Sequence, residues 1–320
     1  MVKKSFFCWI LFLSFALNAY SEAPSAGNNA NFDKPQTLTF LKNAPGDIKD
    51  YGKTTFRKEN AAAIAAIAAL TGVLIWQDQY LVDKAHNLGD HLGISHTNYQ
   101  KTFARIGVPG SSKSLNIEGP FDSGSSLYFL GDGWVDVGLA AGFLTVGLTC
   151  NDNRALQTSS EMAESILASG TVVQALKHVT GRESPFTTDV PRGTWRFFPN
   201  QYDYAKHVPR YDAFPSGHLA AAMATVTVIG ENYPEYTLVR PIGYGLMGAL
   251  SFQMMNNGVH WASDYPLAIA MGYSFGHIAV QKGRHHKTDS ASPSMDFSPV
   301  VLSHGFEIQA TLHFSSSKAV

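Results

Sequence analysis

The feature that most constrains the fold is a series of apolar stretches of helical length spread along the chain. The first covers residues 60–80, is rich in Ala, Ile and Leu, and contains no internal proline. Five more follow, at about 134–149, 160–179, 217–231, 238–256 and 264–281. Because such stretches bury their apolar faces against one another, the sequence predicts an all-α fold, a helical bundle of about six helices.

Three segments outside these stretches predict irregular structure. Residues 22–58 are polar and carry Asn, Pro and Gly, so we expect an irregular N-terminal arm. Residues 94–133 repeat Gly and Ser and predict a long loop-rich connection, a type of segment that often serves function. The aromatic and proline-rich residues 193–214 are expected to be irregular as well and to cover one end of the bundle.

The predicted helical domain occupies residues 59–283, and residues 284–320 form a separate tail. This tail begins as a Ser/Pro/Asp linker. Apolar and polar residues then alternate at 300–302 and 306–314, which predicts a small C-terminal β-hairpin.

The N-terminus predicts export. Lys3 and Lys4 precede an apolar run that ends in small residues near position 21, so residues 1–21 are typical of a signal peptide. An uncleaved membrane anchor is the alternative, although the run is short for a full span. Cleavage would leave Cys150 as the sole cysteine, so the fold must hold by packing in the periplasm or cell envelope.

Charge and hydropathy limit the classes of binding partner that we expect. The chain has 24 basic and 25 acidic residues, and this near balance gives no indication of nucleic-acid binding. Most apolar stretches are shorter than the roughly 20 residues of a membrane span, and several carry charge, which favours a water-soluble or peripherally bound bundle. Partial embedding of residues 61–76 and 238–255 stays open as the alternative.

Three short motifs occur in order in the second half of the chain. They are KHVTGRESP at 177–185, PSGH at 215–218 and HWASD at 260–264. In the second motif, Ser216 and Gly217 precede an apolar helical run, so their backbone N–H groups lie at a helix start, where unpaired donors and the helix dipole favour an anion. His218 is then placed to donate a proton. The competing interpretation is a simple Ser N-cap beside an exposed histidine.

The third motif pairs His260 with Asp264. Residues four apart share one face of a helix, so the carboxylate can accept from one ring nitrogen and leave the other free as a nucleophile. A solvated His/Asp pair is the competing interpretation. A zinc site is a weaker rival because no His-Glu-x-x-His pattern occurs.

The first motif supplies positive charge. Lys177 lies at the end of an apolar helical stretch, where the helix dipole also favours a cation. Simple capping of the helix is therefore the alternative to phosphate binding. Arg182 can grip phosphate oxygens through two parallel hydrogen bonds, which a lysine cannot do.

Taken together, the motifs resemble the signature of the type 2 phosphatidic acid phosphatase/vanadium haloperoxidase superfamily, Lys-x6-Arg-Pro, Pro-Ser-Gly-His and Ser-Arg-x5-His-x3-Asp. The resemblance covers roughly residues 134–281, and its last two blocks match closely. It implies that His260 attacks phosphorus, that Asp264 orients His260, and that His218 protonates the leaving group.

The same resemblance implies that Lys177 and the amides of Ser216 and Gly217 hold the phosphate oxygens, with no metal and no other cofactor. Two arginines of the signature are missing, because the chain has Ser184 and Met254 at their positions. We hypothesise that Arg182 or Arg210 reaches the same oxygens, since a lone lysine under-neutralises a phosphate dianion.

The expected function is therefore a metal-independent phosphatase acting on phosphomonoesters or pyrophosphates. Lipid-linked substrates are favoured by the apolar helices and by the aromatic residues of segment 193–214, although core packing also explains such residues. Two alternatives remain: an inactive envelope protein that retains the fold, and a vanadium-dependent haloperoxidase, which ranks lower because its vanadate would need the missing arginines.

Overall fold

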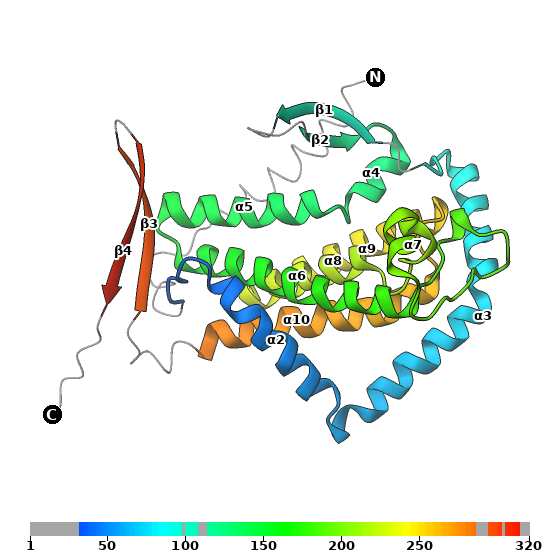
Figure 1. Ribbon diagram of the computed structural model, residues 1–320, viewed down its shortest axis with the longest axis horizontal. Coiled ribbons are helices and arrows are strands. Elements are labelled where there is room, and N and C mark those ends of the chain that lie inside the picture. Colours follow the sequence, from blue (N-terminus) through cyan, green and yellow to red (C-terminus); the bar gives the residue numbers. More distant parts are fainter. Residues whose placement is uncertain (1–31, 98–99, 108–113, 286–293, 303–304, 314–320) are drawn as a thin grey trace.

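The computed structural model describes residues 32–97, 100–107, 114–285, 294–302 and 305–313 (Figure 1). Within these residues the chain forms nine α-helices and two separate two-stranded antiparallel sheets. The predicted all-α class is therefore confirmed. The predicted signal peptide, residues 1–21, lies outside the described residues.

The centre of the molecule is a bundle in which α6, α8 and α10 pack against one another, with three further helices around them (Figure 1). The helix α5 lies against α6, α9 against α8, and α2 against α6 on another side. Their bounds are α2 Thr39–Thr55, α5 Gly133–Cys150, α6 Asn153–Thr180, α8 Gly217–Asn232, α9 Val239–Asn256 and α10 Tyr265–His285.

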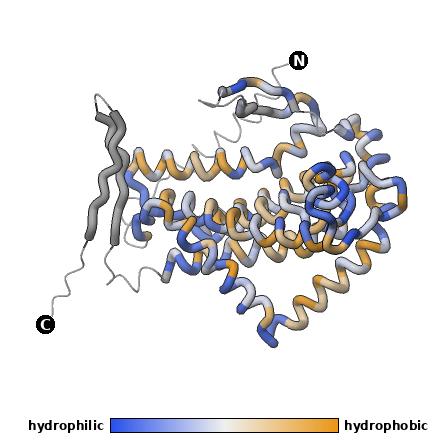
Figure 2. The backbone as a smooth tube through the Cα atoms, viewed as in Figure 1, coloured by the Kyte–Doolittle hydropathy of each residue, from blue (hydrophilic) through white to orange (hydrophobic). Residues whose placement is uncertain are grey.

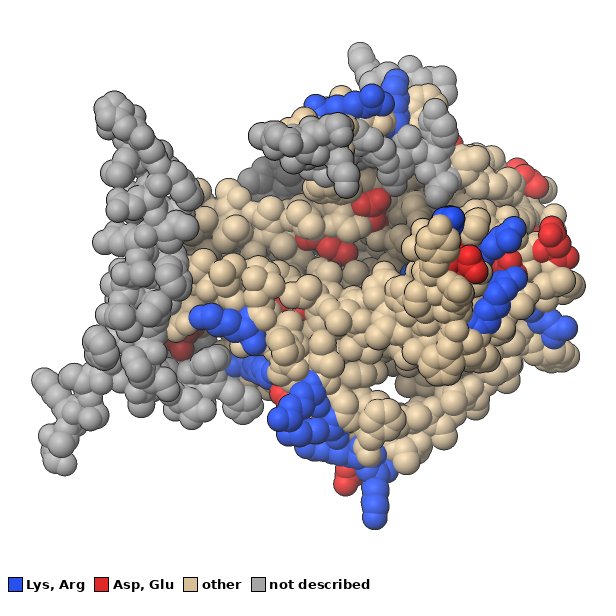
Figure 3. Space-filling model, in the orientation of Figure 1, with Lys and Arg blue, Asp and Glu red and all other residues tan. Residues whose placement is uncertain are grey.

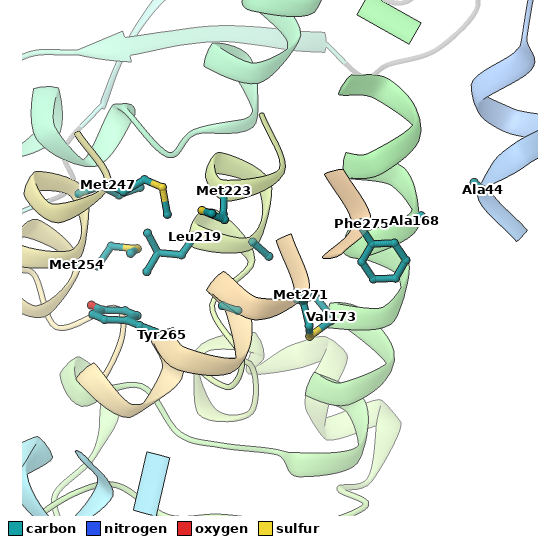
Figure 4. Packing of buried hydrophobic residues seen from close by; sticks show 13 residues of the cluster. Ala44, Ala168, Val173, Leu219, Met223, Met247, Met254, Tyr265, Met271 and Phe275 are labelled. Carbon is teal, nitrogen blue, oxygen red and sulfur yellow. The ribbon is translucent and has the colours of Figure 1, made fainter. Parts of the chain in front are cut away.

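The main core is built mostly from side chains of α8, α9 and α10, among them four methionines and two aromatic residues (Figure 4). Leu219, Met254, Met271 and Phe275 are all at most 1% exposed. Leu219 follows the PSGH motif directly, so the helix that carries this motif is fixed by core packing from its first turn.

Local signals explain where α6 begins and ends. The Asp152 side chain accepts hydrogen bonds from the amides of Arg154 and Ala155, at 2.9 and 3.2 Å, and so caps the N-terminus. Gly181 ends the helix with a φ of +52°, and a Cβ at this position would lie 2.1 Å from the Arg196 carbonyl oxygen. Only glycine fits at this position. The turn at Gly181 directs the following residues across the end of the bundle.

The helix α3 (Ala61–Leu92) has two different halves. Its C-terminal half packs against α9 and the turn η5 (Ala262–Asp264). Its N-terminal half diverges from the bundle and meets α2 at a corner, and it is apolar along its length (Figure 2). The most apolar 18-residue window of this segment has no buried residue.

By length and hydropathy, two helices of the described residues could cross a membrane: the segment Lys58–Leu92, which holds α3, and α5. Partial embedding in a membrane was the alternative prediction for residues 61–76 and 238–255. The first segment lies in a helix that could cross a membrane. The second corresponds to α9, which is not among these helices. The two helices suggest membrane association.

The expectation of irregular structure was wrong in two segments. Residues 39–55 form α2 despite Pro45 and Gly46, because tertiary contacts stabilise it: Asp47 binds Lys282, and Asn43 donates to Glu164 at 3.0 Å. Burial, and next the neighbouring Asp47, raise the pKa of Glu164 above its usual range.

The predicted connection at 94–133 contains strands β1 (Gln100–Gly107) and β2 (Ser114–Pro120), which pair antiparallel, and helix α4 (Ser123–Phe129). Asp122 and Ser125 cap α4 reciprocally through side chain and backbone. Within segment 193–214, the short helix α7 (Gln201–Lys206) interrupts otherwise irregular chain.

The predicted C-terminal hairpin is present and longer than expected. Strand β3 (Ser294–Leu302) pairs antiparallel with β4 (Gly305–His313). The alternation at 300–302 marked only the part of β3 next to the turn, whereas 306–314 covered nearly all of β4, and Phe314 lies outside the described residues.

Candidate active site

The three motifs meet at one end of the bundle around two histidines. The rings of His218 and His260 face each other edge to face, with centroids 5.7 Å apart and planes at 76°. His260 is 2% exposed and His218 is half-buried. Two imidazoles at this separation can act on opposite sides of one small group.

Asp264 fixes the orientation of His260. The Nδ1 atom of His260 lies 3.2 Å from Oδ2 of Asp264, which also accepts the Trp261 amide at 2.8 Å. The pair was expected on one face of an α-helix, but His260 lies two residues before the tighter turn η5, which ends at Asp264 just before α10. Because Nδ1 donates to the carboxylate, Nε2 keeps its lone pair.

Ser216 connects the second motif to the third. Its hydroxyl accepts the Leu219 amide at 3.4 Å and so caps α8, and its own amide donates to the Asp264 carbonyl oxygen at 3.1 Å. The Ser216 amide is therefore engaged inside the protein. In the described part of the chain no acceptor is found for the amides of Gly217 and His218, which start α8.

Lys177 brings positive charge to this helix start. Its side chain is 8% exposed, and its Nζ lies 3.5 Å from Oδ2 of Asp212. A Cβ placed on Gly217 would lie 3.9 Å from the same Nζ. Lys177 and the free amides of α8 thus border one small region beside His218, and Asp212 at present balances the charge there.

The environment keeps His218 neutral in the free protein. Burial, the neighbouring His260 and Lys177 lower its pKa from the ordinary value to about 3. Its Nε2 lies 3.1 Å from the Tyr128 hydroxyl of α4. Its Nδ1 is buried and has no hydrogen-bond partner among the described residues.

Arg182 lies behind Asp264 in a fully buried position. Its Nη1 donates to Asp264 and to the Ser263 hydroxyl, the latter at 2.6 Å, and its Nη2 donates to Asp78 at 2.5 Å. Both terminal nitrogens are thus held by protein carboxylates. This geometry supports His260 through Asp264 and differs from the direct phosphate contact hypothesised from the sequence.

Neither the other hypothesised replacement, Arg210, nor the residues at the third block of the signature, Gln253 and Met254, supply a charge near the two histidines. Arg210 is exposed, and the described residues show no contact of its side chain with His218 or His260. Met254 is fully buried beneath Ser216, with Sδ 3.9 Å from the hydroxyl. Gln253 is buried too and donates to the Ser95 carbonyl oxygen at 3.0 Å.

Sequence reasoning missed four residues of the site: Asp78, Tyr128, Asp212 and Ser263. Three of them lie in or between the motifs or in the predicted loop, where polar residues are ordinary and carry no special signal. Asp78 differs, because a carboxylate inside an otherwise apolar helix is costly unless paired, and this cost could have marked it.

A cleft of about 480 Å³ adjoins the site at Trp261, and its lining includes His86, His96 and Asn257 but neither catalytic candidate histidine. In the part of the chain that the structure describes, no group of three or more His, Cys, Asp or Glu side chains is arranged to hold a metal ion.

Comparison with known families gives one result. Residues 160–286 match the family model of the PAP2 superfamily, and this segment contains all three motifs. No curated protein and no solved structure matches the chain. The superfamily generally comprises phosphatases, which supports a phosphatase-type function. Over residues 160–286, the chain is therefore similar to the PAP2 superfamily.

Proposed function

We propose that the chain is a phosphatase that hydrolyses phosphomonoesters or pyrophosphates through a phosphohistidine on His260. The observation that carries this proposal is the facing pair of His218 and His260, 5.7 Å between ring centroids, beside Lys177 and the free amides that start α8. A nucleophile, an acid and an anion-binding helix start are the groups that phosphoryl transfer requires.

In the first step, the Nε2 lone pair of His260 attacks phosphorus while the bond from phosphorus to the leaving oxygen breaks. The leaving oxygen takes a proton from His218 and departs as an alcohol or, for a pyrophosphate, as a phosphate. Asp264 stabilises the positive charge that develops on the His260 ring through the Nδ1 hydrogen bond.

In the second step, a water oxygen attacks phosphorus and the bond to His260 Nε2 breaks. The water proton goes to His218, which restores its protonated form, and the phosphate leaves. Because His218 is neutral in the free protein, its proton must be taken up when the anionic substrate binds, since nearby negative charge raises the proton affinity of an imidazole.

Lys177 and the amides of Gly217 and His218 are the proposed phosphate-binding groups. The charge that builds on the equatorial oxygens is stabilised most by donors already fixed in place. Arg182 takes a supporting role through Asp264, in place of the direct contact hypothesised from the sequence. The contribution of Arg210 is tested by Arg210→Ala, whose kcat/KM stays unchanged if the exposed side chain takes no part.

A lipid-linked substrate fits the surface around the site. Phe197, Phe198 and Tyr202 of the segment before PSGH are 65–75% exposed. Two helices are also long and apolar enough to cross a membrane, and the predicted signal peptide would bring the protein to the cell envelope. Exposed aromatic side chains suit an amphiphile held at a membrane boundary.

The test measures phosphate release by the purified chain, in detergent and after treatment with a chelator, from p-nitrophenyl phosphate and from phosphatidic acid. The proposal expects release from at least one substrate, inhibition by vanadate, and radiolabel from substrate phosphate that is trapped on wild type but not on His260→Ala. Full activity of His260→Ala would refute the nucleophile. Absence of any release would favour the inactive envelope protein, and halide oxidation activated by vanadate would favour the haloperoxidase.

A further inference from the structure

The helix α3 places one buried carboxylate against the catalytic motifs. Asp78 is fully buried although most of the residues N-terminal to it in α3 are apolar and exposed. It lies outside residues 160–286, the segment matched by the family model. A carboxylate in such a position costs free energy unless all its oxygens are hydrogen-bonded or paired with a cation, so its contacts define its role.

Both oxygens of Asp78 are engaged by the first and third motifs. Oδ1 accepts the Ser263 amide at 3.0 Å, and Oδ2 accepts the Ser263 hydroxyl at 2.6 Å and Nη2 of Arg182 at 2.5 Å. Ser263 precedes Asp264 in the turn η5, and Arg182 binds Asp264 directly. Asp78 thus holds both the backbone and the cation that fix Asp264.

We propose that Asp78 is a positioning residue for the nucleophile, acting on His260 through Ser263, Arg182 and Asp264. The inference rests on the proposed phosphatase function for its catalytic meaning, but the coupling itself is a property of the folded protein. It also makes α3 part of the catalytic unit, since the family segment alone leaves Arg182 with one carboxylate instead of two.

The charges explain how Asp78 acts at a distance. Arg182 lies between two carboxylates, and the ion pair with Asp78 leaves more of the negative charge of Asp264 available to His260. Without the charge of Asp78, Arg182 is balanced by Asp264 alone, and the His260 imidazolium loses stabilisation. The charged or titratable groups that face His260 are Asp264 from η5, His218 from α8 and Tyr265 from α10, with Lys177 of α6 beyond His218.

The experiment compares wild type with Asp78→Asn, which is isosteric and still lets Arg182 pair with Asp264. The titration of His260 is followed by NMR on histidine-labelled protein and assigned with His260→Gln. The expected result is a midpoint lower by on the order of one pH unit, because a nearby negative charge is lost. The limb of the pH profile of kcat/KM that tracks this midpoint moves with it.

Kinetics give the second readout. We expect Asp78→Asn to lower kcat about 10- to 100-fold, as is usual when the partner of a histidine-orienting carboxylate is lost, with KM little changed. Val82→Ala is the matched control: Val82 lies one turn further along α3, is 3% exposed and packs in an apolar cluster with Trp261. It loosens the same helix and should leave the His260 midpoint in place.

An unchanged His260 midpoint in folded Asp78→Asn would overturn the inference, as would an equal shift in Val82→Ala. The NMR readout stands even if wild type releases no phosphate, so failure of the proposed function is seen separately. If Asp78→Asn does not fold, the same measurements are made on Asp78→Glu. It keeps the charge, so kcat should fall while the midpoint stays within a few tenths of a pH unit of wild type, and a full-size shift would contradict the charge argument.

Discussion

At the scale of single residues, the site balances one lysine against one aspartate. Lys177 is paired with Asp212 at 3.5 Å in the free protein, so a phosphate must compete with this carboxylate. Asp212→Asn should therefore tighten the binding of inorganic phosphate or vanadate, and Lys177→Gln should weaken it, each by about tenfold for a partly buried charge contact. Inhibition constants at constant ionic strength measure both. Weaker binding in Asp212→Asn would show that the aspartate belongs to the anion site instead of competing with it.

The pKa of His218 predicts a pH dependence of stability. The folded protein lowers this pKa to about 3, whereas the unfolded chain has the ordinary value near 6.5. Between these values the unfolded chain binds a proton that the folded protein does not, so the free energy of unfolding falls as pH falls from about 6.5 towards 3. The slope is at most about 1.4 kcal/mol per pH unit, and partial exposure of the ring reduces it.

His218→Asn removes this contribution. Urea unfolding at pH 7, 5.5 and 4.5 should show the stability of the variant rising relative to wild type as pH falls. His91→Asn is the control because His91 is exposed on α3. Parallel stability curves for wild type and His218→Asn would contradict the neutral state assigned to His218.

At the scale of secondary-structure elements, sequence reasoning succeeded where the signal was local. The cores of α5, α6, α8, α9 and α10 follow from apolar stretches, and PSGH at the start of α8 follows from its place before one of them. It failed for α2, where Pro45 and Gly46 suggested loop but contacts with residues more than 100 positions away stabilise a helix.

The same limit applies to the site. The motifs pointed to His218, His260 and Asp264, and the structure brings these three side chains together. The binding partners of the Arg182 side chain could not be predicted. Whether it binds phosphate or protein carboxylates depends on Asp78, which only the tertiary structure brings near it. Long-range partners of a buried charge leave no pattern in one sequence.

The helix α4 yields the prediction at this scale. It lies in the predicted loop connection, yet it delivers the Tyr128 hydroxyl to Nε2 of His218 at 3.1 Å. Tyr128→Phe keeps the ring contact and removes one hydrogen bond of about 1 kcal/mol, so kcat should fall about fivefold with KM little changed. Tyr202→Phe, at an exposed aromatic position on α7, is the comparison. An unchanged kcat in Tyr128→Phe would mean that α4 does not position the acid.

At the scale of the whole molecule, charge and apolar surface lie next to each other. Exposed basic residues gather where α2 meets α3, and the space-filling view shows them beside a largely uncharged surface (Figure 3). They are Lys49, Lys53, Arg57 and Lys58. The adjoining half of α3 exposes Leu70, Val73 and Trp76 by 51–70%. This combination is typical of a surface that contacts anionic lipid, where each basic residue contributes about 1 kcal/mol.

The full chain should therefore float with phosphatidylglycerol vesicles in a density gradient, and do so less at high salt, because salt screens the basic corner. Leu70→Asp together with Val73→Asp should abolish flotation, since two charges in an apolar surface oppose insertion. Leu88→Asp with Leu92→Asp is the matched control: both leucines are exposed on α3 but lie in its bundle-packed half. If both double variants float equally well, the N-terminal half of α3 is not the lipid-binding surface. If only the variant with Leu70→Asp and Val73→Asp fails to float, yet it still hydrolyses p-nitrophenyl phosphate, membrane contact serves to bring lipid substrate to a site that is complete without it.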